Sequence, residues 1–424
     1  MTSTSVDVQG RSDVLVVGGG VLGVCCAYFL RESGRDVHLV DQEDIAAGSS
    51  YGNAGLIVPS HSVPLAQPGV VGQALRWMFN PESPFYIKPR LDIDLLTWLW
   101  RFRAASNARC RDKAMPVLRD LILTSRDLYR SFAAMDDMDF GFEERGVLYL
   151  FNTEDGLREG EHEAELVRTV GIETETLGKQ EVDDRLGVNA TVVGGINYPQ
   201  DTHLTPASFV RALATRFQAM GGKFSPNTKV EGFEKDGRKI VGVRTSKGTL
   251  EADEVVLATG SWTPKLAREL GIKAPIQAAK GYSITHRRPD GVPEIPVICA
   301  ESRVAVTPMG DTLRFAGTLE LAGLDLSINQ RRVDAIRRGP PAYISEFETT
   351  SMELIEVWAG LRPVTPDGLS LLGRSPRYDN LTLAAGHAMI GMSSGPASAK
   401  LVTQVITGEE PFMDMSLLDP SRFG

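Results

Sequence analysis

The stretch DVLVVGGGVLGVCCAYFLRESGRDVHLVD, residues 13–41, decides the fold. Its apolar runs and small-residue turn predict a buried strand, a tight turn, a helix and a second strand, uninterrupted by proline. Gly18, Gly20 and Gly23 match the pattern GxGxxG, and Asp41 closes the second strand roughly twenty residues on. The first glycine permits the turn, the second lets backbone approach a pyrophosphate, and the third lets helix and strand pack closely. We therefore expect a dinucleotide at the helix N-terminus, with Asp41 accepting a hydrogen bond from a ribose hydroxyl.

This unit has an alternative interpretation, because a glycine-rich turn also occurs in ordinary α/β domains. The agreement of strand, helix and terminal acid favours a dinucleotide over that alternative. The unit does not separate NAD from FAD, so the choice depends on the rest of the chain.

GSSYGNAG, residues 48–55, follows the second strand closely and so lies near the same ligand. Its small residues let main-chain NH groups reach a flat ring or a phosphate, and its serines and asparagine add short hydrogen-bonding groups. A solvated turn or flexible linker is the alternative, but the flanking DIAA and LIVP are apolar enough to hold the loop down. From this segment we expect the following residues to contact the cofactor: Gly48, Ser49, Ser50, Asn53, Ala54, Gly55 and Leu56.

Composition limits the classes of partner. The chain has 424 residues, 42% hydrophobic, with 45 Lys and Arg against 54 Asp and Glu, a net charge of -9. This size and charge predict a globular protein with a large core and no nucleic-acid partner. The polar N-terminus and the lack of a long apolar run predict a cytoplasmic protein. Four scattered cysteines and six scattered histidines show no ligand spacing, so no metal is expected.

Further motifs identify a family resemblance. Together with the first two segments, VVLATGSW (255–262), GLRPVTPDG (360–368) and AAGHAMIGMSSGP (384–396) resemble the FAD-dependent D-amino-acid oxidase and glycine oxidase superfamily. GSSYGNAG followed by PLAQPGVVGQALRWMFNPESPFYIKP (64–89) is most similar to the bacterial D-amino-acid dehydrogenases. The resemblance covers nearly the whole chain and implies FAD. Related sarcosine oxidases bind flavin through a late cysteine, and this chain has none after Cys299, so non-covalent FAD is expected.

The resemblance also implies a fold and a division into domains. We expect an α/β protein with a Rossmann-like FAD-binding domain and a discontinuous α+β substrate domain built on an antiparallel sheet. The FAD-binding domain is placed at residues 1–60, 200–275 and 355–424. The substrate-binding domain is placed at residues 61–199 and 276–354.

Three residues are implied to act on the substrate. Arg362 in GLRPVTPDG takes the role of substrate-carboxylate ligand, for which two parallel donors on a fixed cation suit best. The alternative is a salt bridge to Asp367. Tyr282 in KGYSIT is expected to assist carboxylate binding, with a core tyrosine as the alternative. His387 is expected near the flavin, with a loop histidine that bonds backbone as the alternative.

The resemblance completes the expected cofactor contacts. Besides Gly18, Gly20, Gly23, Asp41 and the loop residues above, they are Val21, Leu22, Gln42, Val230, Thr259, Gly260, Trp262, Arg362, Gly391, Met392, Ser393 and Ser394.

The implied reaction is hydride transfer from the Cα of a D-amino acid to flavin N5, which yields a 2-oxo acid and ammonia after hydrolysis. Electrons would pass to a quinone or another acceptor. Two alternatives stay open: an oxidase or dehydrogenase of glycine, sarcosine or a cyclic imino acid such as D-hydroxyproline, and a flavin subunit of a multi-subunit amine dehydrogenase. The oligomeric state is left open.

LDIDLLTWLWRFRAA, residues 91–105, carries two tryptophans and several leucines at helical spacing. It is expected to form a helix packed on the substrate domain. The alternative is a peripheral contact with the inner face of the cell membrane, where aromatic and cationic residues are favoured.

Overall fold

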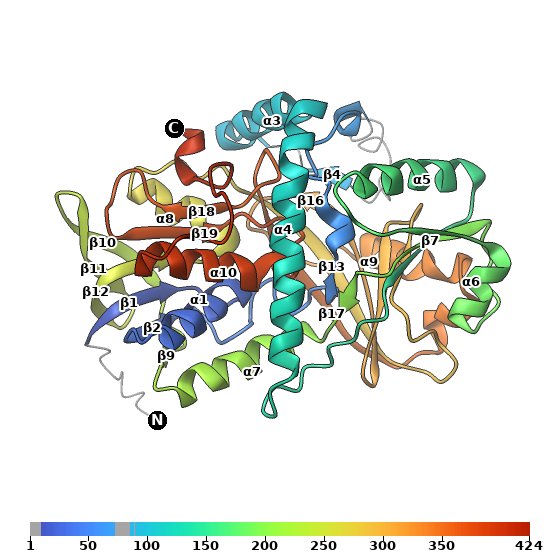
Figure 1. Cartoon of the computed structure of the whole chain (residues 1–424), viewed down its shortest axis with the longest axis horizontal. Coiled ribbons are helices and arrows are strands. Elements are labelled where there is room, and N and C mark those ends of the chain that lie inside the picture. The colour runs from blue at the N-terminus through green and yellow to red at the C-terminus, as the bar shows by residue number, and fades with distance from the viewer. Residues whose placement is uncertain (1–9, 73–84, 89) are drawn as a thin grey trace.

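The computed structural model describes residues 10–72, 85–88 and 90–424, arranged around two β-sheets (Figure 1). The segment 64–89, which carries part of the resemblance, lies partly outside the described residues. Among the described residues, no helix is both long enough and apolar enough to cross a membrane.

The first sheet has a parallel centre. Its strands are β1 (Arg11–Val17), β2 (Val37–Val40), β9 (Lys223–Ser225), β10 (Val230–Asp236), β11 (Lys239–Thr245), β12 (Gly248–Leu257), β18 (Leu371–Arg374) and β19 (Leu381–Ala385). Parallel pairing runs through β9, β2, β1, β12 and β19, while β10 to β12 form an antiparallel meander and β18 pairs antiparallel with β19. This is the expected Rossmann-like arrangement.

Both faces of this sheet are covered, which explains why β1 is apolar at successive positions. Val14 and Val16 pack into the core formed with α1 (Val21–Glu32), α7 (Pro206–Ala219) and α10 (Gly391–Thr407). Leu15 and Val17 point the other way, into a core formed with the meander and α8 (Thr263–Glu269). In Figure 1, α1 and α10 lie across one face of this sheet. The packing fixes the carboxyl ends of β1 and β2 at one edge.

The second sheet is mostly antiparallel. In order, its strands are β17 (Leu354–Val364), β13 (Gln277–Arg287), β16 (Thr312–Leu321), β15 (Val304–Met309), β14 (Val297–Cys299), β5 (Val147–Phe151), β7 (Gly194–Tyr198) and β6 (Glu175–Gly178), and β4 (Phe85–Ile87) pairs with β16. Two pairs, β14 with β5 and β16 with β4, are parallel. The sheet is therefore mainly antiparallel, as expected, with two parallel pairs.

Helices surround the second sheet and join it to the first. They are α3 (Ile93–Ala105), α4 (Ala108–Ala133), α5 (Glu154–Arg168), α6 (Lys179–Leu186) and α9 (Gln330–Arg338). The long α4 runs across the middle of the molecule in Figure 1. A short two-stranded pair, β3 (Leu56–Ile57) with β8 (Thr202–His203), follows the GSSYGNAG loop. The helix expected within residues 91–105 is α3.

These observations confirm the fold class, while the domain boundaries stay a prediction. The first sheet collects its strands from three separate stretches of chain, as a discontinuous domain would. Strand β17, which the expected division assigns to the FAD-binding domain, pairs along its length with β13 in the second sheet.

Candidate active site

A large cavity lies between the two sheets. Its volume is about 1500 Å³, larger than the roughly 300–1,000 Å³ of a pocket for one small ligand. Its wall includes the ends of β1 and β2, the loop 48–56, the turn after β12, and parts of β13, β16 and β17. The start of α10 completes it. The cavity therefore connects the expected dinucleotide site to the second sheet.

The glycines of the first turn have different surroundings. Gly18 has φ +116°, and a Cβ there would lie 2.5 Å from the carbonyl oxygen of Ala258. A Cβ on Gly23 would lie 1.7 Å from the carbonyl oxygen of Gly18, which explains the close approach of helix to strand. A Cβ on Gly20 would meet only the Ser50 hydroxyl, at 3.4 Å, and would otherwise project beside the cavity. The fold thus requires glycine at positions 18 and 23, while the role of Gly20 in admitting a pyrophosphate stays a prediction.

Two helices begin at this cavity. Gly20, Val21 and Leu22 at the start of α1, and Gly391 and Met392 at the start of α10, contribute to its wall. Neither helix has an acidic residue in its first turn. The free NH groups and positive ends of the helix dipoles therefore favour an anionic group in the cavity, which fits a pyrophosphate.

Asp41 closes this end of the site. Its Oδ2 accepts a hydrogen bond from Gly19 N at 2.6 Å and its Oδ1 accepts one from Glu43 N at 2.8 Å. Burial raises the pKa of this carboxyl group, against the lowering effect of those two hydrogen bonds. Each oxygen keeps a further acceptor site, so the carboxylate is fixed in place and still able to bind a hydroxyl group.

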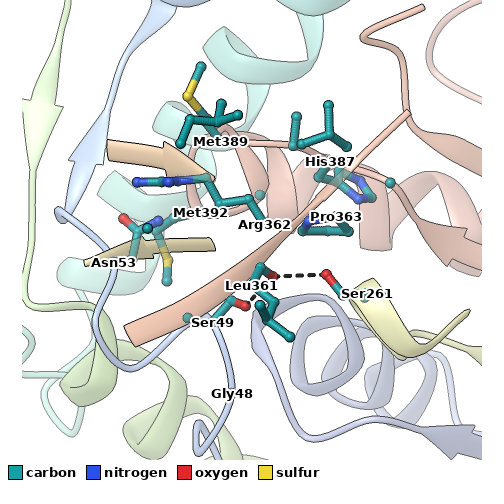
Figure 2. Close-up of a pocket in the computed structure, with 18 of the residues that line it drawn as sticks. Gly48, Ser49, Asn53, Ser261, Leu361, Arg362, Pro363, His387, Met389 and Met392 are labelled. Carbon is teal, nitrogen blue, oxygen red and sulfur yellow. Dashed lines mark hydrogen bonds between the residues drawn. The ribbon is translucent and has the colours of Figure 1, made fainter. Parts of the chain in front are cut away.

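The polar side chains of GSSYGNAG hold the loop itself. Ser50 Oγ accepts from Val21 N at 3.0 Å and so caps α1 from outside the helix. Asn53 Oδ1 accepts from Gly55 N at 2.8 Å. Ser49 Oγ donates to the carbonyl oxygen of Leu361 at 2.5 Å, and Figure 2 shows this bond beside a second one from Ser261. Backbone and small side chains thus remain to face a ligand.

Arg314, which sequence reasoning missed, clamps this loop from the second sheet. Its Nη1 donates to the carbonyl oxygens of Tyr51 at 3.0 Å and Asn53 at 2.9 Å, and its Nε donates to Thr285 Oγ1 at 3.1 Å. Arg314 is 8% exposed, and burial lowers the pKa of its guanidinium. A single arginine within a strand sequence gives no signal of such a contact.

Arg362 projects from β17 into the cavity. Its Nη1 donates to the carbonyl oxygen of Thr318 at 2.6 Å, and a Cβ on Gly281 would lie 2.1 Å from the same atom. Burial lowers the pKa of the guanidinium to about 10, so it stays charged at neutral pH. Asp367, its alternative partner, instead pairs with Arg422 at 2.8 Å. No carboxylate of the described residues lies within ion-pair distance of Arg362, so its charge is available to a ligand.

Tyr282 borders the cavity, but its side chain points away from Arg362. Neighbouring residues of a strand face opposite sides, and the Cβ direction of Gly281 meets the Arg362 guanidinium. Tyr282 accordingly packs with Ile284 in the core on the other side, and its hydroxyl donates to Glu320 Oε2 at 3.0 Å. This placement fits the core-tyrosine alternative, and a substrate contact stays a prediction.

His387 lines the cavity beside Pro363, away from the Arg362 guanidinium, which extends toward Asn53 in Figure 2. Its Nε2 shares a hydrogen bond with Ser398 Oγ at 3.0 Å. The alternative interpretation expected this histidine to bond to the backbone, whereas its partner is a side chain. Burial lowers the pKa of this imidazole to about 3, so it is neutral. A neutral histidine here shapes the wall and adds no charge.

The cavity gathers most of the expected site residues. The exceptions are Gly23, Gly55, Ser393 and Ser394, which do not border it. Ser393 Oγ donates to the carbonyl oxygen of Leu56 at 2.9 Å and accepts from Val58 N, and Ser394 Oγ donates to the carbonyl oxygen of Ile390. These four residues support the wall from behind, while their roles as direct contacts stay predictions.

A Rossmann-type glycine turn shares one cavity with a buried arginine that forms no ion pair with the described residues, an arrangement that fits a dinucleotide-dependent enzyme. A family profile described as "FAD dependent oxidoreductase" matches residues 13–405. The chain belongs to this family of FAD-dependent oxidoreductases.

Individual relatives agree with this assignment. A protein of Bradyrhizobium diazoefficiens named D-amino acid dehydrogenase is 34% identical over 421 residues, covering 97% of this chain and 98% of the relative. One of Helicobacter pylori with the same name is 30% identical, covering 93% and 95%. Among solved structures, glycine oxidase from Geobacillus kaustophilus is similar with a TM-score of 0.79 at 22% identity, covering 97% and 99%. L-Proline dehydrogenase from P. horikoshii is similar with a TM-score of 0.75 at 20% identity, covering 98% of each chain. These structural likenesses concern the fold.

Replacing Arg314 with methionine is expected to weaken FAD binding. The variant loses both bonds to the loop carbonyls, and charged hydrogen bonds contribute about 1.5–3 kcal/mol each, so the dissociation constant should rise at least about tenfold. Titration of apoprotein with FAD, followed by flavin fluorescence, measures this change. Thr285→Val, which removes only the other partner of Arg314, is the control and should bind FAD nearly as the wild type does. Equal affinities of Arg314→Met and wild type would contradict the clamp.

His387 should make the protein sensitive to acid. An unfolded histidine takes up a proton near pH 6.5, whereas the folded one does so only near pH 3, so stability falls as pH drops through this window. His387→Gln should reduce that fall by up to about 1.4 kcal/mol per pH unit. His61 and His203, with pKa values lowered to about 4, leave a residual slope. Urea unfolding at several pH values, with exposed His162→Gln as control, measures the difference, and identical slopes would refute it.

Proposed function

We propose that the protein oxidises D-amino acids at Cα, with a substrate carboxylate bound by Arg362. The main evidence is the charged guanidinium of Arg362. It is buried in the same cavity as the glycine-rich turn expected to bind the dinucleotide, and it forms no ion pair with a carboxylate of the described residues. A buried cation is costly without an anionic partner, and a bidentate carboxylate suits the guanidinium best. The D-configuration and the amino-acid class come from the curated relatives named D-amino acid dehydrogenase.

Several contacts hold Arg362 ready for this role. The carbonyl oxygen of Thr318 fixes one end of the guanidinium, at 2.6 Å. The residue before it, Leu361, is held through its carbonyl oxygen by Ser49 and Ser261. Ser49 and Ser261 belong to the loop 48–55 and the turn after β12, both expected to bind the cofactor. The arginine and the cofactor site are therefore tied together in position.

FAD, when bound, supplies the acceptor for the Cα hydride, at N5, and the imino acid formed is hydrolysed by water to a 2-oxo acid and ammonia. The protein residues bind and orient the substrate. Arg362 fixes the carboxylate, the bare loop 48–55 lets backbone approach the cofactor, and the apolar walls exclude water. The positive end of α10, which borders the cavity, would stabilise negative charge on a cofactor bound there.

Anaerobic absorbance spectra test this function directly. Bleaching of the flavin band by D-alanine or D-proline, and not by the L-isomers, is expected. Glycine, sarcosine and the hydroxyproline isomers complete the panel. Bleaching by L-isomers alone, or by none of these compounds, would overturn the proposal.

We also propose that the FAD is not covalently bound. Cys25, Cys26 and Cys299 are buried and Cys110 is exposed, and none of the four borders the cavity. Acid precipitation should therefore leave all of the yellow colour in the supernatant. Colour that stays with the precipitate would show a covalent link.

Because the relatives are named dehydrogenases, we propose an acceptor other than oxygen, and specifically a quinone reached at a membrane surface. The observation that favours a membrane contact is the exposed face of α3, where Ile93, Leu96 and Trp100 are 81%, 60% and 70% exposed and Trp100 also borders the cavity. Such an apolar face suits the boundary of lipid headgroups and acyl chains. The wild type should sediment with anionic vesicles, and a double variant that carries both Leu96→Ser and Trp100→Ser should not. Equal sedimentation of both proteins would refute this contact.

A further inference from the structure

Trp358, which the sequence reasoning did not single out, lies two residues before Gly360 and four before Arg362 on β17. Residues at even spacing on a strand share a face, so the indole and the guanidinium project to the same side. Both side chains border the cavity. Trp358 is therefore a large aromatic neighbour of the proposed carboxylate ligand.

Two glycines make room for these side chains. Gly281 on β13 and Gly360 on β17 are directly opposite each other in the sheet. A Cβ on Gly281 would lie 2.1 Å from Arg362 Nη1, and one on Gly360 would lie 1.8 Å from Cη2 of Trp358. The guanidinium and the indole therefore lie over neighbouring positions of one glycine-lined floor. Any side chain at either glycine would displace them.

The indole also reaches the cofactor loop. A Cβ on Gly52 would lie 2.0 Å from Cε3 of Trp358, so the six-membered ring fits between the backbone of Gly52 and that of Gly360. The ring centroid of Tyr51, from the same loop, lies 6.3 Å from that of Trp358. Trp358 is thus held from two sides, and its ring closes the gap between the loop and β17.

We propose that Trp358 is a specificity-determining residue that limits the size of the substrate group placed on the loop side of Arg362. A carboxylate fixed at Arg362 leaves the Cα substituents to extend along the floor, and in this direction the rigid indole ends the available space. The chamber therefore favours small aliphatic side chains over aromatic ones. This inference rests on the proposed function of Arg362.

Two series of ligands test this limit. In the first, kcat/KM is measured for D-alanine and D-phenylalanine. In the second, acetate and benzoate are titrated into the oxidised protein and followed by the change in flavin absorbance. Trp358→Ala should shift the ratio of the larger to the smaller ligand upward at least about tenfold in both series, since pocket size discriminates roughly 10–200-fold. For Trp358→Phe, both ratios should lie between those of the wild type and those of Trp358→Ala.

Controls separate the limit from general damage. Tyr51→Phe keeps an aromatic ring next to Trp358 and should therefore keep the wild-type ratios of larger to smaller ligand. If Trp358→Ala loses its flavin, Trp358→Phe and Trp358→Leu provide the test. Unchanged ratios in flavin-loaded variants, or an equal loss for both ligand sizes, would overturn the inference. If the wild type is not reduced by any D-amino acid, the proposed function fails, whereas the carboxylate series still tests Trp358.

Discussion

Arg362→Met is expected to lower kcat/KM for D-amino acids by about 30- to 5,000-fold, the largest effect on activity anticipated for this chain. Removing one partner of a buried, hydrogen-bonded charge pair costs about 2–5 kcal/mol, and the substrate carboxylate would lose the guanidinium proposed to bind it. Methionine keeps much of the side-chain volume over Gly281. Anaerobic stopped-flow reduction of the bound flavin at a range of substrate concentrations measures the loss.

Two further variants show which property of the arginine matters. Arg362→Lys keeps the charge but not the two parallel donors, so it should fall between the wild type and Arg362→Met. Arg374→Met is the matched control, because Arg374 pairs with Glu254 on the first sheet and does not border the cavity. Flavin content is measured on each protein. A wild-type kcat/KM in a flavin-loaded Arg362→Met variant would show that Arg362 does not bind the substrate.

Gly23→Ala is expected to prevent a stable, FAD-binding fold. The added methyl would lie 1.7 Å from the carbonyl oxygen of Gly18, a backbone atom that cannot move without shifting α1 from β1. The destabilisation should reach about 3 kcal/mol or more, at the upper end of the cost of overpacking. Urea unfolding of the apoprotein and recovery of soluble protein measure it. Wild-type stability in this variant would contradict the packing role of Gly23.

Gly20→Ala separates access from packing in the same turn. Its methyl would meet only Ser50 Oγ, at 3.4 Å, and the backbone at Gly20 has φ −78°, which alanine adopts readily. The apoprotein should therefore keep its stability. FAD affinity should fall at least about tenfold, because the methyl projects where the backbone is expected to approach the pyrophosphate. FAD binding equal to that of the wild type would show that the pyrophosphate does not come close to Gly20.

Several features were accessible from the sequence because they depend on residues near each other in the chain. The turn at Gly18, the close packing at Gly23 and the acid at Asp41 lie within one strand, helix and strand, whose geometry is nearly constant. The helix within residues 91–105 likewise follows from local periodicity. The family assignment follows from several such motifs in order along the chain.

Other features depended on the pairing of distant segments. Sequence alone left Asp367 as a candidate partner of Arg362, and the fold brings Arg422 to Asp367 instead. The motif placed Tyr282 near the substrate; in the structure Tyr282 borders the cavity, but the register of β13 puts its side chain on the face opposite Arg362. Neither outcome is encoded in local spacing, because each depends on which strands become neighbours and in what register.

The sequence by itself determined the fold class, the cofactor family and the presence of Arg362 in the motif GLRPVTPDG. Only the tertiary structure decided what surrounds that arginine. Gly281 and Gly360 lie opposite each other because β13 and β17 pair in one register, and Trp358 lies between Gly360 and Gly52 because the loop 48–55 packs against β17. Arg314 on β16 likewise reaches the loop 48–55 only because the fold brings these distant segments together. Local spacing specifies elements, whereas the walls of a site form where elements distant in sequence come into contact.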